Sequence, residues 1–488
     1  MTTKELQQAI LKDKEKGIPD IEIGKKYGVT YREIERVITR LHGVNISTLK
    51  KEKKITSLAP NEFKEEQNTV WSFKKRGNWA THSGHYRGNW SPYIPRNVIL
   101  KYSKPGELVL DYFCGAGTTA VEAKLLGRRC LALDINENAI ALAKQNIDFS
   151  MDIQQLNFLK ETDHLEIYDP ELRIGDARNL SFLNDNSIDL ICAHPPYANI
   201  IHYTDSGNGD LSFFEIDSFL NEMKKVASES FRVLKPGRQC AILIGDTRKQ
   251  KYVVPLGFAL INVYLDAGFR LRELVIKRQH NCKTTGFWYN NSIKYNFLLL
   301  AHEYLQIFEK PQAKEQTKDT RSDLKPKEIT PIEITASGKN SSNLETTTVW
   351  IFPEDNFEKQ LDDNVIGRYS QGKEKDLLYL KSTALDEISS PLMLEDYLMQ
   401  IENHIVKALP SMSQGTFVVI QTQDIRIGEY VEPLAKRLID ALKSLDLRLK
   451  EIVVVTSNGA NKNGITLKDH LAINHKYLLI YETQNESR

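Results

Sequence analysis

Short apolar runs alternate with segments of helical pattern through the middle of this chain, and that alternation constrains the fold more than any other feature. The clearest apolar runs are 107–113, 129–135, 188–193, 239–246 and 296–308. Strands of this kind, separated by helices, are typical of a mostly parallel sheet with helices on its faces. We therefore expect a doubly wound α/β domain over residues 65–312.

Three further segments flank this domain, since a chain of 488 residues is too long for one ordinary core. Residues 313–345 are polar and contain almost no clustered apolar side chains, so they are predicted to form a flexible linker. Residues 346–488 are predicted to form a last compact segment, and residues 1–54 a helical head.

The head has the pattern of a helix-turn-helix. Helices are predicted over 3–16, 20–27 and 31–41, with the turn Gly28-Val29-Thr30 before the last of them. Such motifs place the final helix in the major groove of DNA, and the head carries 13 Lys or Arg against 8 Asp or Glu. The alternative is a small three-helix bundle that serves as an interaction module.

The last segment has the pattern of a truncated copy of the α/β domain. Residues 237–256 align without gaps with residues 415–434, and the Val-Trp-x-Phe run at 70–73 recurs at 349–352. Matches in one register favour an internal repeat over chance similarity between two helix-plus-strand units. The copy has no glycine-rich loop and no Pro-Pro-Tyr. It is therefore predicted to be non-catalytic and to serve as a platform for DNA, a partner chain or a second copy of this chain.

Residues 109–120 predict a buried strand, a tight glycine loop and the start of a helix. Gly115 and Gly117 let the backbone turn sharply and approach a ligand, because neither has a Cβ. Asp111 ends the strand, where open α/β sheets bind ligands, and Asp134 follows at the spacing of a carboxylate that accepts ribose hydroxyls. There is no third glycine of a dinucleotide fingerprint, and an acidic residue before the loop suits a ligand with a cationic amino-acid group. The alternative is a purely structural strand–helix turn.

A second motif, His194-Pro195-Pro196-Tyr197, follows the predicted strand 188–193. Proline has no N–H, so the strand leaves the sheet with oriented carbonyls beside a polar side chain and an aromatic ring. Acceptors of this kind favour the pyramidal nitrogen that an exocyclic base amine adopts in a transition state of group transfer. Tyr197 can stack on a base rotated out of a duplex.

The run Phe113-Cys114-Gly115-Ala116-Gly117-Thr118-Thr119, followed downstream by Pro195-Pro196-Tyr197, resembles the amino-group DNA methyltransferases, which make N6-methyladenine or N4-methylcytosine. The resemblance covers residues 65–312. It implies a Rossmann-like methyltransferase sheet, S-adenosylmethionine as cofactor and double-stranded DNA as partner. It implies that the cofactor is lined by Asp111, Phe113, Gly115, Gly117, Thr118, Thr119, Asp134 and Asp176. It also implies that the target base is held, and catalysis performed, by His194, Pro195, Pro196 and Tyr197.

His194 departs from the family pattern, which usually has Asp, Asn or Ser at that position. A neutral imidazole can accept one hydrogen bond, so catalysis is retained in this interpretation, and the choice between adenine and cytosine stays open. A degenerate site is the alternative, and the intact cofactor loop argues against it. No Pro-Cys dipeptide occurs in the chain, which disfavours the 5-methylcytosine enzymes.

Two other functions remain as alternatives. One is an RNA base methyltransferase, because Pro-Pro-Tyr loops also serve N2-guanine chemistry on structured RNA. The other is a DNA-binding regulator with an inactive methyltransferase core.

An aromatic and basic run precedes the glycine loop, over residues 79–90. It is interpreted as a packed N-terminal lid on the cofactor side, and closure of the site over DNA is the alternative.

The composition predicts a soluble protein of the cytoplasm. No apolar run approaches the length of a membrane span, and the start of the chain has no apolar signal-peptide core. The five cysteines include no C-x-x-C pair and do not cluster with histidines, which favours reduced thiols and no bound metal. A net charge of +1 excludes a polycation that coats nucleic acid indiscriminately.

Overall fold

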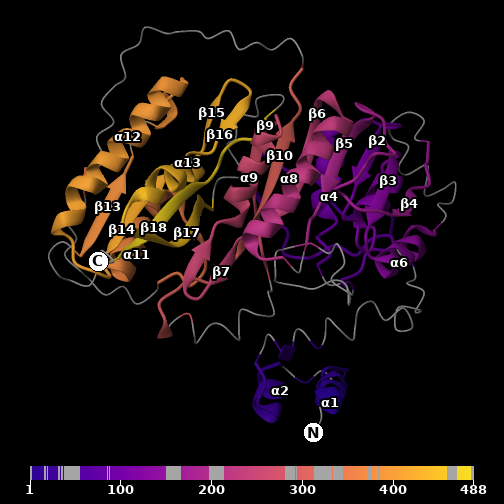
Figure 1. Ribbon diagram of the computed structural model, residues 1–488, viewed down its shortest axis with the longest axis horizontal. Helices are drawn as coiled ribbons and strands as arrows, with labels where there is room; N and C mark the ends of the chain where they lie inside the picture. The colour runs from indigo at the N-terminus through magenta and orange to yellow at the C-terminus, as the bar shows by residue number, and fades with distance from the viewer. Residues whose placement is uncertain are drawn as a thin grey trace.

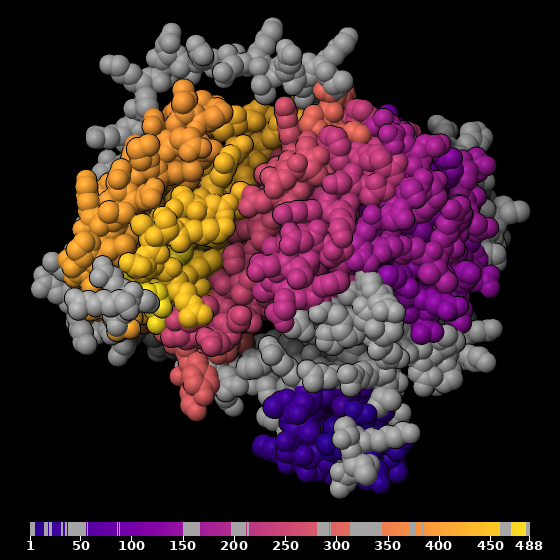
Figure 2. Space-filling model, in the orientation of Figure 1, coloured from indigo at the N-terminus to yellow at the C-terminus, as the bar shows by residue number. Residues whose placement is uncertain are grey.

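The computed structural model consists of two α/β halves side by side and a small helical head (Figure 1). The space-filling view shows the first half, purple to magenta, packed directly against the second, orange to yellow (Figure 2). The structure describes residues 3–15, 18, 20–30, 33–34, 37, 55, 57–84, 86, 88–149, 166–196, 211, 214–280, 292, 294–312, 332–333, 344–370, 376–382, 385–458 and 470–484.

The first half is built on an eight-stranded sheet with the order β1-β9-β10-β6-β5-β2-β3-β4. Its strands are β1 (Val70–Ser72), β2 (Leu108–Asp111), β3 (Arg129–Asp134), β4 (Glu171–Ile174), β5 (Ile188–Ala193), β6 (Leu234–Ile244), β9 (Arg270–Arg278) and β10 (His302–Glu309). All neighbours are parallel except β10, which runs antiparallel to both β6 and β9. The carboxyl ends of the other seven strands therefore lie at one edge of the sheet.

Helices cover both faces of this sheet. They are α4 (Tyr93–Tyr102), α5 (Thr118–Leu125), α6 (Glu137–Ile147), α8 (Ile216–Val233) and α9 (Leu256–Asp266). Successive strand residues belong to different cores, because side chains alternate across a strand. Val109 is in the core formed with α4, α5 and α6, whereas Leu110 is in the core formed with α8 and α9. The doubly wound sheet predicted from the sequence is confirmed.

The second half is built on a six-stranded sheet with the order β11-β13-β14-β18-β17-β12. Its strands are β11 (Ile332–Glu333), β12 (Val349–Phe352), β13 (Leu377–Lys381), β14 (Phe417–Thr422), β17 (Leu447–Ser457) and β18 (Lys476–Thr483). Its α-helices in the described ranges are α11 (Phe357–Tyr369), α12 (Pro391–Ala408) and α13 (Leu434–Ala441).

The two sheets share one topology over five strands. The order β12-β17-β18-β14-β13 repeats β1-β9-β10-β6-β5, and the strand directions also match. The described strands of the second half include no counterpart of β2, β3 or β4. Instead the short β11 pairs antiparallel with β13, on the side where β2 pairs with β5 in the first half. Within its described residues, the second sheet thus has no strand equivalent to those that carry the glycine loop and Asp134.

Each half sends a two-stranded hairpin to the other half. The hairpins are β7 (Thr247–Lys249) with β8 (Tyr252–Val254), and β15 (Ile425–Ile427) with β16 (Tyr430–Glu432). Arg248 of the first hairpin pairs with Glu451 on β17. Arg426 of the second hairpin pairs with Glu273 on β9, with 2.6 Å between Nη2 and Oε2. These are corresponding positions of the repeat, so the contacts are reciprocal, as they are in a twofold-symmetric dimer.

The same reciprocity holds deeper in the interface. His302 Nδ1 lies 2.9 Å from Thr348 Oγ1 of the second half, and His475 Nδ1 lies 2.8 Å from Thr69 Oγ1 of the first. A single cluster of buried apolar side chains also runs from one half into the other. The two halves are therefore pseudo-twofold partners within one chain.

The head contains α1 (Thr3–Glu15) and α2 (Asp20–Tyr27). Thr30 and Glu33 then form a capping box, in which Thr30 N donates to Glu33 Oε2 at 2.7 Å and Glu33 N donates to Thr30 Oγ1 at 3.3 Å. A capping box marks the start of a helix. Most of the third helix predicted over 31–41 lies outside the described residues, so the helix-turn-helix stays a prediction.

Candidate active site

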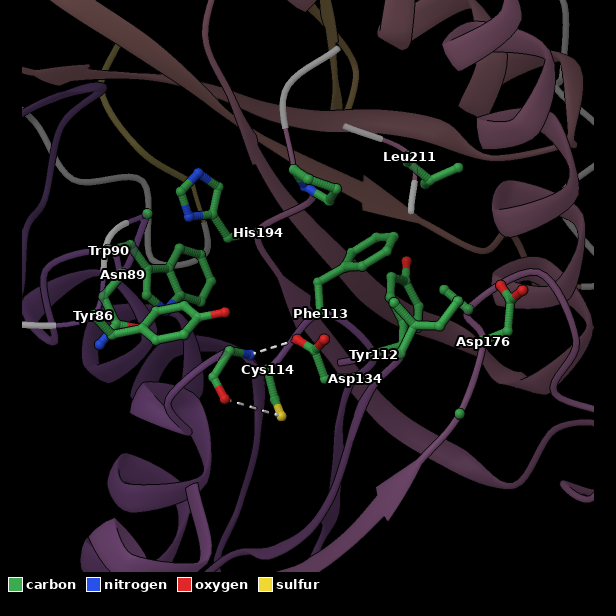
Figure 3. Close-up of a pocket in the computed structure, with 16 residues that line it drawn as sticks. Tyr86, Asn89, Trp90, Tyr112, Phe113, Cys114, Asp134, Asp176, His194 and Leu211 are labelled. Carbon is green, nitrogen blue, oxygen red and sulfur yellow. Dashed lines mark hydrogen bonds between the residues drawn. The ribbon is translucent and has the colours of Figure 1, made fainter. Parts of the chain in front are cut away.

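A pocket opens at the edge of the first sheet where the carboxyl ends of β2, β3, β4 and β5 lie (Figure 3). Its hollow measures about 720 Å³ including the open mouth. The lining residues are Tyr86, Gly88, Asn89, Trp90, Tyr112, Phe113, Cys114, Gly115, Asp134, Ile135, Gly175, Asp176, Ala177, His194, Pro196 and Leu211. Both motifs found in the sequence therefore contribute to one cavity, although about 80 residues of chain separate them.

The glycine loop forms one wall of the pocket. Gly115 has a φ of 50°, in the left-handed region that favours glycine. A Cβ at this position would lie 3.0 Å from Tyr86 Cε1, so the absence of a side chain leaves the backbone accessible. Gly115 N donates to Asp134 Oδ2 at 2.9 Å, and Asn136 N donates to Asp134 Oδ1 at 2.9 Å. These two bonds fix the Asp134 carboxylate at the end of β3, facing the pocket.

Asp111 lies behind the loop and does not line the pocket. Its Oδ1 accepts a hydrogen bond from Phe113 N at 3.0 Å, and its Oδ2 accepts one from Thr119 Oγ1 at 2.5 Å. Burial raises the pKa of Asp111 to about 7, although these two bonds oppose the shift. This carboxyl group therefore stabilises the conformation of the loop, because its two oxygens accept hydrogen bonds from the loop residues.

Gly117, Thr118 and Thr119 also lie outside the pocket lining, at the start of α5. Gly117 has a φ of 81°, and a Cβ there would lie 3.0 Å from the Cβ of Ala143 on α6. Thr118 and Thr119 are buried. These residues let α5 begin directly after the loop and pack closely against α6.

Asp176 lies on the side of the pocket away from His194 (Figure 3). Arg178 holds it with a backbone N–H at 2.9 Å and with its guanidinium, for which the Nη2–Oδ2 distance is 2.6 Å. Burial opposes ionisation, yet these hydrogen bonds lower the pKa of Asp176 below its usual range. The group is therefore an ionised acceptor at neutral pH.

His194 follows β5 and stacks on Trp90, with 5.6 Å between ring centroids and 20° between the planes. It lines the pocket and is partly buried. This burial lowers the pKa of His194 to about 4, against a smaller opposing effect from Glu303. The imidazole is therefore neutral at physiological pH, with one N–H donor and one acceptor nitrogen.

The other members of the second motif divide between the pocket and the interior. Pro196 lines the cavity, whereas Pro195 is buried and does not. Tyr197 lies outside the described residues.

A buried carboxylate anchors the segment that closes the pocket on the Trp90 side. Glu122 on α5 accepts hydrogen bonds from Trp79 Nε1 at 2.6 Å and from Arg96 Nη1 at 2.9 Å, and His82 Nε2 also lies 2.6 Å from it. Burial opposes ionisation, yet the charge of Arg96 and the hydrogen bonds with Arg96 and His82 lower the pKa of Glu122. The predicted packed lid is therefore held to the helix that follows the glycine loop.

Arg76 fixes the lid at its other end. Its Nη1 donates to the carbonyl of Asn89 and its Nη2 to the carbonyl of Trp90, both at 2.7 Å. The sequence drew attention to Trp90 as part of an aromatic run, but it gave no signal for Arg76 or Glu122. Their partners are 13 to 43 residues away in the chain, beyond the reach of any local pattern.

Sequence reasoning also left several pocket residues without a predicted role. They are Tyr112, Cys114, Ile135, Ala177 and Leu211. Tyr112, Cys114 and Ile135 flank residues that were named, so their position next to strand ends was the available signal. Leu211 follows a segment outside the described residues and had none.

The shape and chemistry of the pocket suit a nucleoside with an attached charged group. Two carboxylates, Asp134 and Asp176, are placed to accept hydrogen bonds from hydroxyl and amino groups. In the view of Figure 3, Phe113 lies between Asp176 and His194. Gly115 lets the backbone approach a ligand where a Cβ would intrude. S-adenosylmethionine, with its ribose, adenine and amino-acid group, fits this set of donors and acceptors.

Within the ranges that the structure describes, no three His, Cys, Asp or Glu side chains are arranged to hold a metal ion. Over those same ranges, every helix is too short or too polar to cross a bilayer.

Comparison with known proteins places the chain in a family. The sequence profile of the DNA methylase family matches residues 12–145 and 188–379, which is more than half of the chain. A general methyltransferase domain profile matches residues 103–253. The chain belongs to the DNA methylase family, and the resemblance carried by the two motifs is confirmed. The methyl donor of this family is S-adenosylmethionine, as the sequence predicted.

Individual relatives align only with parts of the chain. The tRNA (guanine(10)-N2)-dimethyltransferase of Methanothermobacter thermautotrophicus is 32% identical over 113 residues, which cover 23% of this chain and 29% of that protein. The Type II methyltransferase M.SmaI of Serratia marcescens is 34% identical over 88 residues, covering 18% of this chain and 29% of the relative. The Type II methyltransferase M2.DpnII of Streptococcus pneumoniae is 33% identical over 86 residues. The chain thus spans about three tenths of the length of these relatives.

Among solved structures, a SAM-dependent methyltransferase from Methanosarcina mazei is similar at 17% sequence identity with a TM-score of 0.30. The match covers 44% of this chain and 97% of that one.

Proposed function

We propose that this protein transfers a methyl group from S-adenosylmethionine to an exocyclic amino group of a DNA base, N6 of adenine or N4 of cytosine. The observation that carries the proposal is the meeting of the two motifs in one pocket, with the Gly115 loop and Asp134 on one side and His194 on the other. Bound S-adenosylmethionine supplies a methyl group on a positively charged sulfur. The chain's own residues must then bind the nucleoside, present the base and handle its amino protons.

The carboxylates hold the nucleoside end. Asp134 accepts hydrogen bonds from ribose hydroxyls, since both of its oxygens are fixed by backbone N–H groups at 2.9 Å and retain further lone pairs. Asp176 accepts from the adenine amino group, because Arg178 keeps it ionised.

His194 and the loop after it hold the target base. The neutral imidazole accepts a hydrogen bond from the base amino group, and stacking on Trp90 fixes the plane of the ring. An acceptor placed at the amino hydrogens favours the pyramidal nitrogen of the transition state. Pro195 and Pro196 hold the backbone carbonyls beside it in one direction, and Tyr197 stacks on the base.

We extend the proposal to the other segments of the chain. Residues 65–312 are the catalytic domain, and residues 313–345 link it to a non-catalytic domain, 346–488, which has no described counterpart of β2, β3 and β4. Because the two domains share one apolar core and reciprocal ion pairs, the second domain serves as a built-in subunit. It occupies the face that a second copy of the catalytic domain would otherwise need. Residues 1–54 contact duplex DNA through the predicted helix-turn-helix.

RNA is the second candidate substrate. The relative from Methanothermobacter thermautotrophicus is named for an N2-guanine activity on tRNA, and its 113 aligned residues make it one of the longer matches. The chemistry is the same, since a base amino group again receives the methyl.

A competition experiment separates the two substrates. Protein with radiolabelled S-adenosylmethionine is incubated with equal masses of genomic DNA and bulk tRNA, and each polymer is then recovered and counted. We expect label in DNA. Label confined to tRNA would overturn the DNA proposal and support the second candidate, and cofactor binding without label in either polymer would support the inactive-regulator alternative.

A further inference from the structure

A group of basic side chains lies at the carboxyl ends of β1 and β9, at the same edge of the sheet as the pocket. Ser72, the last residue of β1, pairs in register with Arg278, the last residue of β9. Ser72 Oγ lies 2.9 Å from His280 Nε2, which ties the chain after β9 to the end of β1. Lys74 and Lys75 follow Phe73, the first residue after β1, and both are exposed.

The other cations nearby have structural partners. Lys277 Nζ donates to Glu303 Oε2 at 2.7 Å. Arg76 holds the carbonyls of Asn89 and Trp90. Their charges are therefore used within the fold.

Arg278 differs from these two residues. In the part of the chain that the structure describes, no ion pair within 4.0 Å includes Arg278, Lys74 or Lys75. Partial burial lowers the pKa of the Arg278 guanidinium, and Glu345 offsets this only by attraction across a longer distance. A partly desolvated guanidinium that contacts no carboxylate is well placed to bind an anion.

The position of these cations relates them to the target base. The strands β9, β10, β6 and β5 are successive neighbours, so three strand spacings, about 14 Å, separate Arg278 from the end of β5 that carries His194. At about 3.4 Å per nucleotide along a duplex strand, that distance corresponds to about four nucleotides. Both sites also lie at the same edge of the sheet, because β1, β9 and β5 are parallel.

The internal repeat shows that the fold does not require these cations. Where the first half has Lys74-Lys75-Arg76 after its Val-Trp-x-Phe strand, the second half has Pro353-Glu354-Asp355. In the repeat register, Thr456 and Asn458 stand where the first half has Arg278 and His280. The interface residues that hold the halves together are kept in both copies. The basic residues occur only in the copy that has the pocket.

We propose that Lys74, Lys75 and Arg278 bind backbone phosphates of the DNA strand whose base enters the pocket. This proposal rests on the proposed function in taking DNA as the substrate. Phosphate contacts of this kind carry no sequence information but fix the register of the strand relative to the site. Each contact releases a counterion, so it contributes to affinity and makes the affinity depend on salt.

The test compares two triple variants that remove the same charge. The cluster variant is Lys74→Gln, Lys75→Gln and Arg278→Thr, in which threonine is the residue that the second half has at the corresponding position. The control variant is Lys144→Gln, Lys224→Gln and Lys443→Gln, three exposed lysines on α6, on α8 and after α13. Binding of the full-length proteins to a fluorescent duplex oligonucleotide of mixed sequence is measured by anisotropy between about 50 and 200 mM salt.

We expect the slope of the logarithm of the association constant against the logarithm of the salt concentration to become shallower by about 2 to 3 in the cluster variant. Each lost phosphate contact reduces the magnitude of this slope by about 0.9. The control variant should change the slope by less than about 0.5. Equal slopes for the two variants, with normal S-adenosylmethionine binding in both, would overturn the proposal. A second cluster variant, Lys74→Gln with Lys75→Gln, keeps Arg278, and its slope should be shallower than that of the wild type by about 2. The test therefore still applies if the Arg278 substitution impairs folding.

The same samples separate this proposal from the proposed function. If the wild-type protein binds DNA with a steep slope that the cluster variant loses, but methylates no DNA, then the phosphate site stands and the proposed reaction fails. If the wild-type protein methylates DNA and the cluster variant has the wild-type slope, the reaction stands and the phosphate site fails.

Discussion

Replacing Arg426 by methionine tests whether the two halves depend on their reciprocal ion pairs. The Arg426 guanidinium lies 2.6 Å from Glu273 Oε2, and the Glu273 side chain is fully buried. Methionine keeps most of the side-chain volume but leaves the carboxylate in the interface without its cation. Removing one partner of a buried pair costs about 3 to 5 kcal/mol, because the remaining charge is buried and uncompensated. Glu273 also accepts a hydrogen bond from Leu471 N at 3.1 Å, which favours the lower end of that range.

The pseudo-twofold arrangement makes the prediction more specific. Arg248→Met should cost about as much as Arg426→Met, because Glu451 is buried as deeply as Glu273. Urea denaturation of each full-length variant, followed by intrinsic fluorescence, measures the change in free energy of unfolding. Lys443→Met serves as the control, since its partner Asp440 is a third exposed and the pair is worth less than about 1 kcal/mol.

The cost should also depend on pH. Burial raises the pKa of Glu273, and Arg426 opposes that rise. Without the arginine the folded-state pKa rises further above the unfolded value, so the variant favours the protonated carboxyl. Its stability relative to the wild type should therefore recover as the pH falls toward the unfolded pKa of Glu273, and should be lost as the pH rises. A cost below about 1 kcal/mol at neutral pH for both arginine variants would refute the account of the interface.

Three further predictions concern the pocket and the glycine loop. The rate of methyl transfer should be constant between about pH 6 and 8, because the neutral form of His194 is lost only as the pH falls through about 4. An inflection near pH 6.5 that His194→Gln abolishes would contradict the conclusion that His194 is neutral in this range. Asp134→Ala should raise the Kd for S-adenosylmethionine, measured by calorimetry, by about 10- to 100-fold, since hydrogen bonds to a charged group contribute about 1.5–3 kcal/mol. An unchanged Kd would show that Asp134 does not bind the cofactor. Gly117→Ala should destabilise the fold by about 1–3 kcal/mol in thermal unfolding, because its φ of 81° and a contact of 3.0 Å with Ala143 Cβ both oppose a side chain. Gly428→Ala is the control, because Gly428 has a φ of 61° but no atom lies within 4 Å of the added Cβ. It should lower the free energy of unfolding by less than Gly117→Ala does, since only the backbone conformation is strained. Equal losses in the two variants would disprove the packing argument.

Much of the catalytic half could be predicted from sequence because its strands are buried on both faces. Such strands are continuous apolar runs, and the loops at their carboxyl ends carry the residues with chemistry. Gly115, Asp134 and His194 were named from that reasoning and Asp176 from the family resemblance, and all four line the pocket.

The sequence was less informative where contacts come from distant parts of the chain. Asp111 was expected at the cofactor, yet its carboxyl group is bonded to the loop residues Phe113 and Thr119. The apolar run at 296–308 was expected to be one strand, but β10 begins only at His302. The residues before it bond instead to the second half, as Leu298 N does to Glu451 Oε1 at 2.9 Å. An apolar run indicates burial and does not reveal which half of the molecule covers it.

The interface between the halves illustrates the same limit. Arg248 and Arg426 were visible as matching residues of the aligned segments, which indicated an internal repeat. That each arginine bonds to the glutamate of the opposite half depends on the packing of two complete sheets. No pattern within either copy contains that information.

The most direct test of the account is nucleoside analysis of DNA after incubation with the protein and labelled S-adenosylmethionine. Unmethylated genomic DNA is digested to nucleosides, which are separated and counted. The account predicts label in N6-methyladenine or N4-methylcytosine, and the loss of that label in His194→Ala with cofactor binding retained. Label in 5-methylcytosine, or no label in DNA from a protein that binds both DNA and cofactor, would contradict it.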